Sequence, residues 1–239
     1  MKKSIRVWLG LAFALSIISN SYADWRSYVW TNEYQTMPKG SAEIEYALTQ
    51  TMPDTNQSRI NSWEHRVELE YGITDNWDVS LYQLLQYETT DSKTATRYDG
   101  FKVETRYRFG QKGQYILDPL LYFEYERGPD FSKPSVAEVK LVLAKDVGDF
   151  NISYNEIFER NLENRGKTES AYAVGLSYNI IPSLKIGIES KGSYSERETA
   201  VGPTVSWSRG KLWAAVGAVF GVNRRTDDLQ VRMMTGFFF

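Results

Sequence analysis

Apolar and polar residues alternate along most of this chain of 239 residues. Over 60–72, for example, Val67 and Leu69 fall on one face of an extended backbone, and Glu68 and Glu70 fall on the other. Because successive side chains of a strand point to opposite faces, this period of two predicts β-strands. Runs of this kind occur at about 40–50, 60–72, 77–88, 98–109, 117–126, 135–145, 149–160, 170–179, 184–188, 201–207, 212–220 and 229–239.

The connections between these runs are of two kinds, which alternate along the chain. Tight turns are predicted at 74–76, 110–114, 146–149, 182–183 and 209–210, and longer polar loops at 51–59, 89–97, 127–134, 161–169, 191–198 and 223–228. Antiparallel neighbours joined in this way place the tight turns at one end of a sheet and the long loops at the other. The pattern therefore predicts an all-β fold, a single antiparallel up-and-down transmembrane β-barrel of about 12 strands.

The same alternation predicts which face of the barrel meets lipid. Beyond the first residues the chain has no stretch of about 18 apolar residues, which excludes a helical membrane protein, whereas a spanning strand needs only about 9 to 11 alternating residues. Arg or Lys on the lipid face near the membrane midplane costs about 2 to 4 kcal/mol. We therefore expect the charged face to line the lumen, and the apolar face, with Tyr and Trp near the strand ends, to face lipid.

The N-terminus has a different composition. A cluster of positive charge precedes an apolar run over 7–18, and small residues precede a cleavage site after Ala23. This pattern predicts a secretory signal peptide over 1–23, because the apolar run is too short for a spanning helix. Its removal changes the net charge from −2 to −5, which does not suit a nucleic-acid-binding protein. The chain has no cysteine, which excludes disulfides.

The last run, LQVRMMTGFFF over 229–239, ends on an aromatic residue. It resembles the terminal strand of bacterial outer-membrane β-barrels, in which the final aromatic belongs to a signal read by the barrel-assembly machinery. The resemblance assigns that signal to Phe237 and Phe239, although Gly236 lies nearer the end than the glycine of the usual signal. It implies the outer membrane of a Gram-negative cell, with its lipid and lipopolysaccharide as surroundings. It also implies that the tight turns and both termini are periplasmic and the long loops external.

Residues 40–239 are predicted to form the barrel, and residues 24–39 a periplasmic N-terminal segment rich in Trp and Tyr. Three placements are open for this segment: a tail, an extra edge strand, or a peptide folded into the lumen as a partial plug. The general looseness of chain termini favours a tail or an edge strand. The plug is the placement that would bear on function.

Charged side chains dominate the face predicted to line the lumen. The fourth and fifth runs oppose basic and acidic residues, and the closing strand makes Arg232 a candidate partner for Glu43 or Glu45. One interpretation is a water-filled pore whose charges orient a small polar solute. The other is a lattice of ion pairs that fills a narrow lumen and braces the barrel. The candidate lining residues are Glu43, Glu45, Glu64, Arg66, Glu68, Glu70, Lys102, Glu104, Arg106, Arg108, Glu124, Glu126, Glu138, Lys140 and Arg232.

Small residues gather on the inward face of the eighth to eleventh runs. They either leave room for a channel or an inward-folding loop, or permit curvature of the barrel wall. These residues are Gly175, Ser177, Gly187, Gly202, Ser206, Ala215, Gly217 and Gly221.

The single histidine, His65, bears on catalysis. Outer-membrane phospholipase A, also a 12-stranded barrel, resembles this chain in size, and its catalytic histidine has a serine two residues further on. Here that position is Val67. A serine hydrolase needs a general base within reach of its nucleophile, so we predict no catalytic residues and no enzyme activity. Metal-ligand clusters and nucleotide-binding loops are also missing from the sequence, so no metal or cofactor is expected.

The sequence thus predicts a narrow porin or channel for small hydrophilic or charged solutes. Its size is similar to that of narrow monomeric channels for acidic sugars or nucleosides. The alternatives are a closed structural or surface-binding barrel without transport and an outer-membrane lipid-modifying enzyme. The identity of the solute and the oligomeric state are left open.

Overall fold

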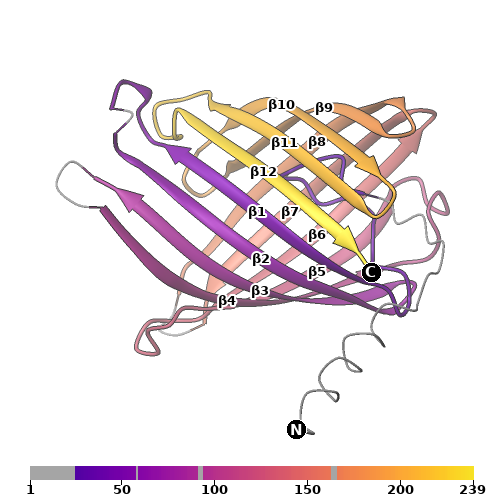
Figure 1. The fold of residues 1–239 in the computed structure, drawn as a ribbon, viewed down its shortest axis with the longest axis horizontal. Helices are drawn as coiled ribbons and strands as arrows, with labels where there is room; N and C mark the ends of the chain where they lie inside the picture. The colour runs from indigo at the N-terminus through magenta and orange to yellow at the C-terminus, as the bar shows by residue number, and fades with distance from the viewer. Residues whose placement is uncertain (1–24, 58, 91–93, 163–165) are drawn as a thin grey trace, which may run out of the picture.

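The computed structural model describes residues 25–57, 59–90, 94–162 and 166–239; the predicted signal peptide and its cleavage site lie outside them. The described residues form antiparallel strands and one short 3₁₀ helix, η2 (Thr55–Gln57), and Figure 1 shows their arrangement. The strands are β1 (Ala42–Met52), β2 (Asn61–Thr74), β3 (Trp77–Thr89), β4 (Thr94–Arg108), β5 (Asp118–Arg127), β6 (Val136–Val147), β7 (Phe150–Asn161), β8 (Thr168–Ile181), β9 (Leu184–Ser193), β10 (Ala200–Arg209), β11 (Leu212–Gly221) and β12 (Leu229–Phe238).

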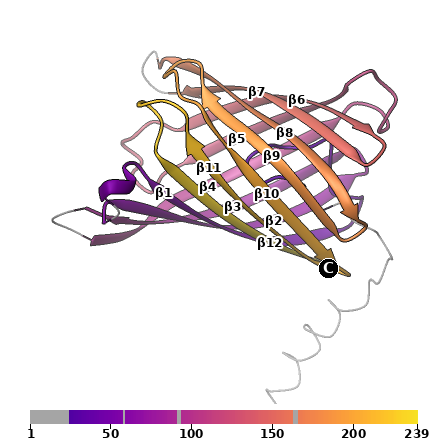
Figure 2. The same ribbon diagram turned by 90° about the horizontal axis from the view of Figure 1, so that it is seen from above.

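The strands form a closed barrel (Figures 1 and 2). Each strand pairs with its neighbours in sequence, and β1 pairs with β12 over a ladder that runs from Glu43 opposite Phe238 to Met52 opposite Leu229. Closure leaves no strand edge unpaired, so the backbone groups of every strand have partners within the sheet. The predicted all-β, 12-stranded up-and-down barrel is therefore confirmed.

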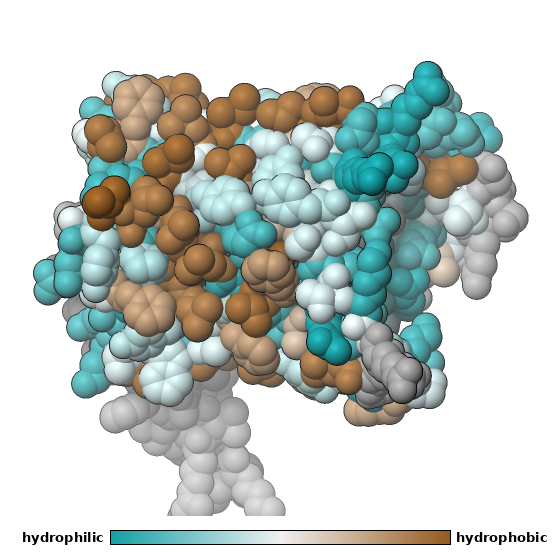
Figure 3. All heavy atoms as spheres, turned by 180° about the vertical axis from the view of Figure 1, so that it is seen from behind, coloured by the Kyte–Doolittle hydropathy of each residue, from teal (hydrophilic) through white to brown (hydrophobic). Residues whose placement is uncertain are grey.

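The two faces of the barrel differ as the alternation predicts. Large apolar side chains such as Leu69, Phe123 and Val216 are exposed on the outer surface, where they gather into broad apolar patches (Figure 3). Charged neighbours such as Glu68 and Glu124 are buried on the inner face. None of the described residues belongs to a helix long and apolar enough to cross a membrane.

The connections follow the predicted alternation except between β4 and β5. The tight turn predicted at 110–114 is instead a connection over 109–117, longer than the β9–β10 loop over 194–199. The carboxylate of Asp118 holds it in place, accepting hydrogen bonds from the N–H groups of Gly113 at 2.7 Å and Tyr115 at 3.2 Å. The prediction was wrong because Gly110 and Gly113 are typical of a tight hairpin turn, whereas the longer connection is stabilised by Asp118, which belongs to the following strand.

Residues 25–37, here called the lumenal segment, lie inside the barrel, where Figure 1 shows them as an indigo trace behind the front strands. Ser27, Tyr28, Val29 and Thr31 are each at most 3% exposed. The sequence favoured a tail or an edge strand for this stretch. The structure instead has the third placement, a peptide folded into the lumen, because polar groups of the barrel wall bind its backbone.

Candidate functional site in the barrel lumen

The lumenal segment enters and leaves the barrel at the same end. Near its start, the Trp25 carbonyl accepts a hydrogen bond from Lys185 Nζ at 3.1 Å, and near its end the Thr36 hydroxyl donates to the Asp75 carbonyl at 2.8 Å. Lys185 and Asp75 both lie at the end that carries the tight turns. The segment is therefore a loop inserted from the tight-turn end, with its apex at residues 29–31.

Glu189 on β9 binds the apex of this loop. Its carboxylate is fully buried and accepts hydrogen bonds from the backbone N–H groups of Val29 at 2.9 Å, Trp30 at 2.9 Å and Thr31 at 2.8 Å. The Thr31 hydroxyl donates a fourth at 3.0 Å. Arg232 on β12 completes the anchor by donating to the Val29 carbonyl at 3.1 Å. Hydrogen bonds to a charged acceptor are stronger than neutral ones, so this carboxylate is the strongest single anchor of the apex.

The descending half of the loop binds β7. The side-chain oxygen of Asn155 accepts from the Asn32 N–H at 2.7 Å, and its amide nitrogen donates to the Asn32 carbonyl at 2.9 Å. Ser153 donates to the same carbonyl at 2.6 Å. Within the segment, the Glu33 carboxylate accepts from both the backbone N–H and the hydroxyl of Ser27 at 2.6 Å, which closes the base of the loop.

Two of the small inward residues, Gly175 on β8 and Gly217 on β11, make room for the segment, whereas the close neighbours of Gly187, Gly202 and Gly221 belong to the barrel wall and its loops. A Cβ added at Gly175 would overlap the ring of Tyr28, and one added at Gly217 would lie 2.6 Å from Val29 Cγ2. The space beside these small residues is therefore occupied by the N-terminal part of the chain itself.

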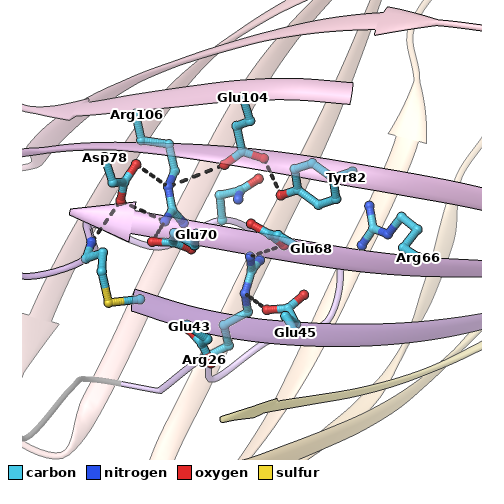
Figure 4. Close-up of polar contacts among 12 residues, drawn as sticks. Arg26, Glu43, Glu45, Arg66, Glu68, Glu70, Asp78, Tyr82, Glu104 and Arg106 are labelled. Carbon is cyan, nitrogen blue, oxygen red and sulfur yellow. Dashed lines mark hydrogen bonds and ion pairs between the residues drawn. The ribbon is translucent and has the colours of Figure 1, made fainter. Parts of the chain in front are cut away.

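The opposite wall, β1 to β5, carries a dense ionic network (Figure 4). Arg106 is buried and forms ion pairs with Glu70, with Asp78 at 2.8 Å and with Glu104 at 3.4 Å. Arg26 of the lumenal segment joins the same wall, with its Nε atom 3.1 Å from Glu45. On this side the lumen is filled by side chains that neutralise one another, as the ion-pair interpretation expects.

Tyr82 and Asp78 on β3 belong to this network, although the sequence did not single them out. The Tyr82 hydroxyl donates to Glu104 at 2.5 Å, and the guanidinium of Arg66 lies 5.7 Å from the centre of the Tyr82 ring. Asp78 also accepts from the Met37 N–H at 2.8 Å, which ties the end of the lumenal segment to the wall. Position alone could have identified both residues, because they alternate with the outward-facing residues of β3.

The structure places the candidate lining residues on inward-facing positions, buried or half-buried. The buried ones are Glu43, Glu45, Glu68, Glu70, Glu104, Arg106 and Glu124. The half-buried ones are Glu64, Arg66, Lys102, Arg108, Glu126, Glu138, Lys140 and Arg232.

Two predicted pairings have different outcomes. Lys102 bridges Glu124 at 2.9 Å and Glu126 at 2.8 Å, so β4 and β5 oppose charges as expected. Arg232, however, lies opposite Thr49 and donates to its hydroxyl at 2.8 Å; it does not pair with Glu43 or Glu45. The register explains the difference, because the aromatic end of β12 extends along β1 as far as Glu43.

His65 lies on the outer face, where its Nδ1 atom is 2.7 Å from the Tyr46 hydroxyl. Among the described residues, no group of three or more His, Cys, Asp or Glu side chains is arranged to hold a metal ion.

Two polar cavities lie on either side of the lumenal segment. One, of about 280 Å³, is at the tight-turn end and is lined by Trp25 and Arg26 of the segment and by Arg108 of the wall. The other, of about 320 Å³, lies beyond Trp30 toward the long loops. The segment thus divides the lumen between its two ends.

Replacing Arg106 with methionine is expected to lower the free energy of unfolding by about 3 to 5 kcal/mol, because three carboxylates would lose their buried partner. Urea unfolding in lipid vesicles, followed by tryptophan fluorescence, measures the change. Arg97→Met is the control, since Arg97 pairs with Glu88 and Asp99 at 3.0 Å on the exposed surface, where such pairs contribute about 0 to 1 kcal/mol. Equal effects of the two variants would contradict a bracing role for Arg106.

No protein-family model matches this sequence, and a search of curated proteins finds no match. Solved structures match it in fold. The KdgM porin in complex with disordered oligogalacturonate matches with a TM-score of 0.58 and 12% identity over 82% of this chain and 98% of that one. The NanC porin matches with a TM-score of 0.54 and 10% identity over 82% and 98%. The translocator domain of the autotransporter NalP from Neisseria meningitidis matches with a TM-score of 0.53 and 8% identity over 82% and 87%. The chain, a closed antiparallel barrel of 12 strands, is therefore similar in fold to these three proteins.

Proposed function

We propose that this chain is an outer-membrane channel for small hydrophilic or charged solutes, and that the lumenal segment gates it. The observation that carries the proposal is the pair of polar cavities at opposite ends of the lumen, separated by a peptide that hydrogen bonds, ion pairs and the packing of Val29 and Tyr34 hold in place without a covalent bond to the wall. Withdrawal of that peptide would join the two cavities. A porin of the same fold, KdgM, binds an oligogalacturonate, which supports passage of a charged solute.

The outer face supports the proposed location. Exposed apolar residues surround the barrel, as a membrane requires of strands that cross it. Phe237 and Phe239 are exposed at the end of the chain, where the barrel-assembly machinery would read them. In this placement the tight turns and the entry of the lumenal segment are periplasmic, and the long loops meet lipopolysaccharide.

The way the segment is attached supports gating. It joins the barrel at Pro38 and Gly40, and with the predicted cleavage after Ala23 its other end is free. Gly40 has a φ of +75°, which favours glycine at this bend. The segment can therefore withdraw toward the periplasm without any change in the strands.

A closed structural barrel is the second candidate, and the ionic network on β1 to β5 favours it. Single-channel recording in planar lipid bilayers separates the two. A channel gives discrete conductance steps, in the full chain or when the lumenal segment is released. Folded protein that gives no steps in either form, at any voltage, would overturn the channel and leave the structural barrel.

Replacing Arg108 with alanine is expected to raise the permeability ratio of potassium to chloride by about two- to three-fold. Arg108 lines the cavity at the tight-turn end, and its guanidinium donates to the Asp75 carbonyl at 2.7 Å and to the side chain of Asn76 at 3.3 Å. It forms no ion pair with any described carboxylate, so its removal takes away one fixed positive charge.

Reversal potentials in a potassium chloride gradient measure the change. Arg209→Ala is the matched control, because Arg209 is exposed at the β10–β11 turn and lines neither cavity. An Arg108→Ala channel with unchanged selectivity would show that solutes do not pass this residue.

A further inference from the structure

Charges of both signs line the cavity at the long-loop end. Glu138, Glu159 and Glu169 line it from β6 to β8, Glu198 lines it from the β9–β10 loop, and two cations, Lys191 on β9 and Arg232 on β12, complete the charged lining. Trp30, at the apex of the lumenal segment, also lines it. The volume of about 320 Å³ is at the lower end of the range for small-molecule sites.

The two cations have no carboxylate partner among the described residues. Lys191 donates to the side-chain oxygen of Gln230 at 2.8 Å, and Arg232 donates to the Thr49 hydroxyl and the Val29 carbonyl. Both charges lie beside the Trp30 ring, at 5.8 and 5.7 Å from its centre. Both cations are half-buried and therefore partly withdrawn from water without a counter-ion, so this pair leaves room for an anionic group.

The carboxylates are likewise incompletely neutralised. Glu138, Glu159 and Glu169 are direct cross-strand partners on β6, β7 and β8. Lys140 pairs with Glu138 at 2.9 Å, but within the described part of the chain Glu159 and Glu169 form no ion pair. Like charges directly opposite each other destabilise a sheet, and a bound cation would relieve this repulsion.

Trp30 connects the two sides. Its indole Nε1 is buried without a hydrogen-bond partner among the described residues, and its ring offers an apolar surface in the cavity. An unsatisfied buried donor costs about 1 to 3 kcal/mol, which a ligand oxygen would recover.

We infer that this cavity binds a small zwitterion, a solute that carries a carboxylate and an ammonium group on a short apolar stem. The carboxylate contacts Lys191, Arg232 and the Trp30 N–H, the ammonium group contacts Glu159 and Glu169, and the stem lies on the Trp30 ring. The inference deepens the proposed function, on which it rests for the route by which the solute reaches the site. It explains why charges of both signs line one cavity without pairing with each other.

Isothermal titration calorimetry of the folded full chain in detergent tests the site with three matched probes: 5-aminopentanoate, pentanoate and pentylamine. We expect 5-aminopentanoate to bind about tenfold more tightly than either singly charged probe. Lys191→Met should weaken 5-aminopentanoate and pentanoate about tenfold and leave pentylamine unchanged. Glu159→Gln should weaken 5-aminopentanoate and pentylamine and leave pentanoate unchanged. Lys167→Met, at an exposed residue outside the cavity, is the control and should change none of the three affinities.

The inference is overturned if pentanoate or pentylamine binds as tightly as 5-aminopentanoate, or if the two cavity variants behave like the control. It is also overturned if 5-aminopentanoate does not bind to protein that conducts in bilayers, a result that leaves the channel intact. Zwitterion binding to a barrel that never conducts would support the site and overturn the channel.

Discussion

Replacing Glu189 with alanine is expected to raise the unitary conductance of the reconstituted protein several-fold. The Glu189 carboxylate accepts four hydrogen bonds from Val29, Trp30 and Thr31. Hydrogen bonds to a charged group each contribute about 1.5 to 3 kcal/mol, so their loss removes the strongest polar anchor of the apex and leaves the Arg232 hydrogen bond and the packing of Val29. The three freed backbone N–H groups would then be more stable when they donate hydrogen bonds to water outside the lumen. The segment would therefore leave the space between the two cavities.

Glu189→Gln should give an intermediate conductance, because an amide keeps the size of the side chain but has only one acceptor oxygen. Glu196→Ala is the control for loss of a carboxylate, since Glu196 is exposed on the β9–β10 loop and forms an ion pair with the exposed Lys167 at 3.3 Å. A chain that lacks residues 25–37 sets the upper limit of conductance. Should Glu189→Ala fold normally and conduct like the unmodified protein while the deletion conducts more, another contact would hold the segment.

The barrel could be predicted from the sequence because a strand with one face toward an apolar environment and the other toward a polar lumen must alternate apolar and polar residues. Leu69 and Glu68 show the rule at two adjacent positions, with one exposed outside and the other buried inside. The same alternation placed the candidate lining residues on the inner face. Alternation within a strand does not fix the register between strands, however, because register depends on how far each strand extends along its neighbour. For this reason Arg232 was expected beside Glu43 or Glu45 and lies opposite Thr49.

Register also creates an arrangement that no single strand reveals. Carboxylates from seven strands are placed at successive cross-strand positions, so they form one row around the wall that is interrupted only by Ser80 on β3. The row consists of Glu43, Glu70, Ser80, Glu104, Glu124, Glu138, Glu159 and Glu169. Arg106, Lys102 and Lys140 form ion pairs with the carboxylates that they reach. The row ends at Glu159 and Glu169, which line the cavity at the long-loop end and form no ion pair within the described part of the chain.

The lumenal segment could not be placed from the sequence, because it has no period and its partners are far away along the chain. Asn32 binds Asn155, and Val29 binds Glu189. In the sequence, the run of small inward residues on β8 to β11 was the one feature that left room for an inward-folding loop on that side of the lumen. The sequence does contain a signal for Glu189. This carboxylate lies on the inward face of β9, as Gly187 does, and the adjacent inward positions of β8 carry no basic residue that could pair with it.

A disulfide between the segment and the wall is expected to cancel the effect of Glu189→Ala. The chain has no cysteine, so a pair introduced by Val29→Cys and Gly217→Cys has no native thiol to compete with it. A Cβ added at Gly217 lies 2.6 Å from Val29 Cγ2. With a carbon–carbon bond of about 1.5 Å, the two Cβ atoms lie no more than about 4.1 Å apart, below the upper limit of about 4.5 Å for a disulfide.

In the Glu189→Ala background, the oxidised pair should keep conductance at the level of the unmodified protein, and a thiol reductant added to the bilayer chamber should raise it several-fold. The two single-cysteine variants in the same background control for the substitutions and should conduct at the high level with or without reductant. Thiol labelling before and after reduction verifies that the bond has formed. If the cross-linked and reduced proteins conducted equally, Glu189→Ala would act on conductance by some route other than release of the segment, and the lumenal segment would not be a gate.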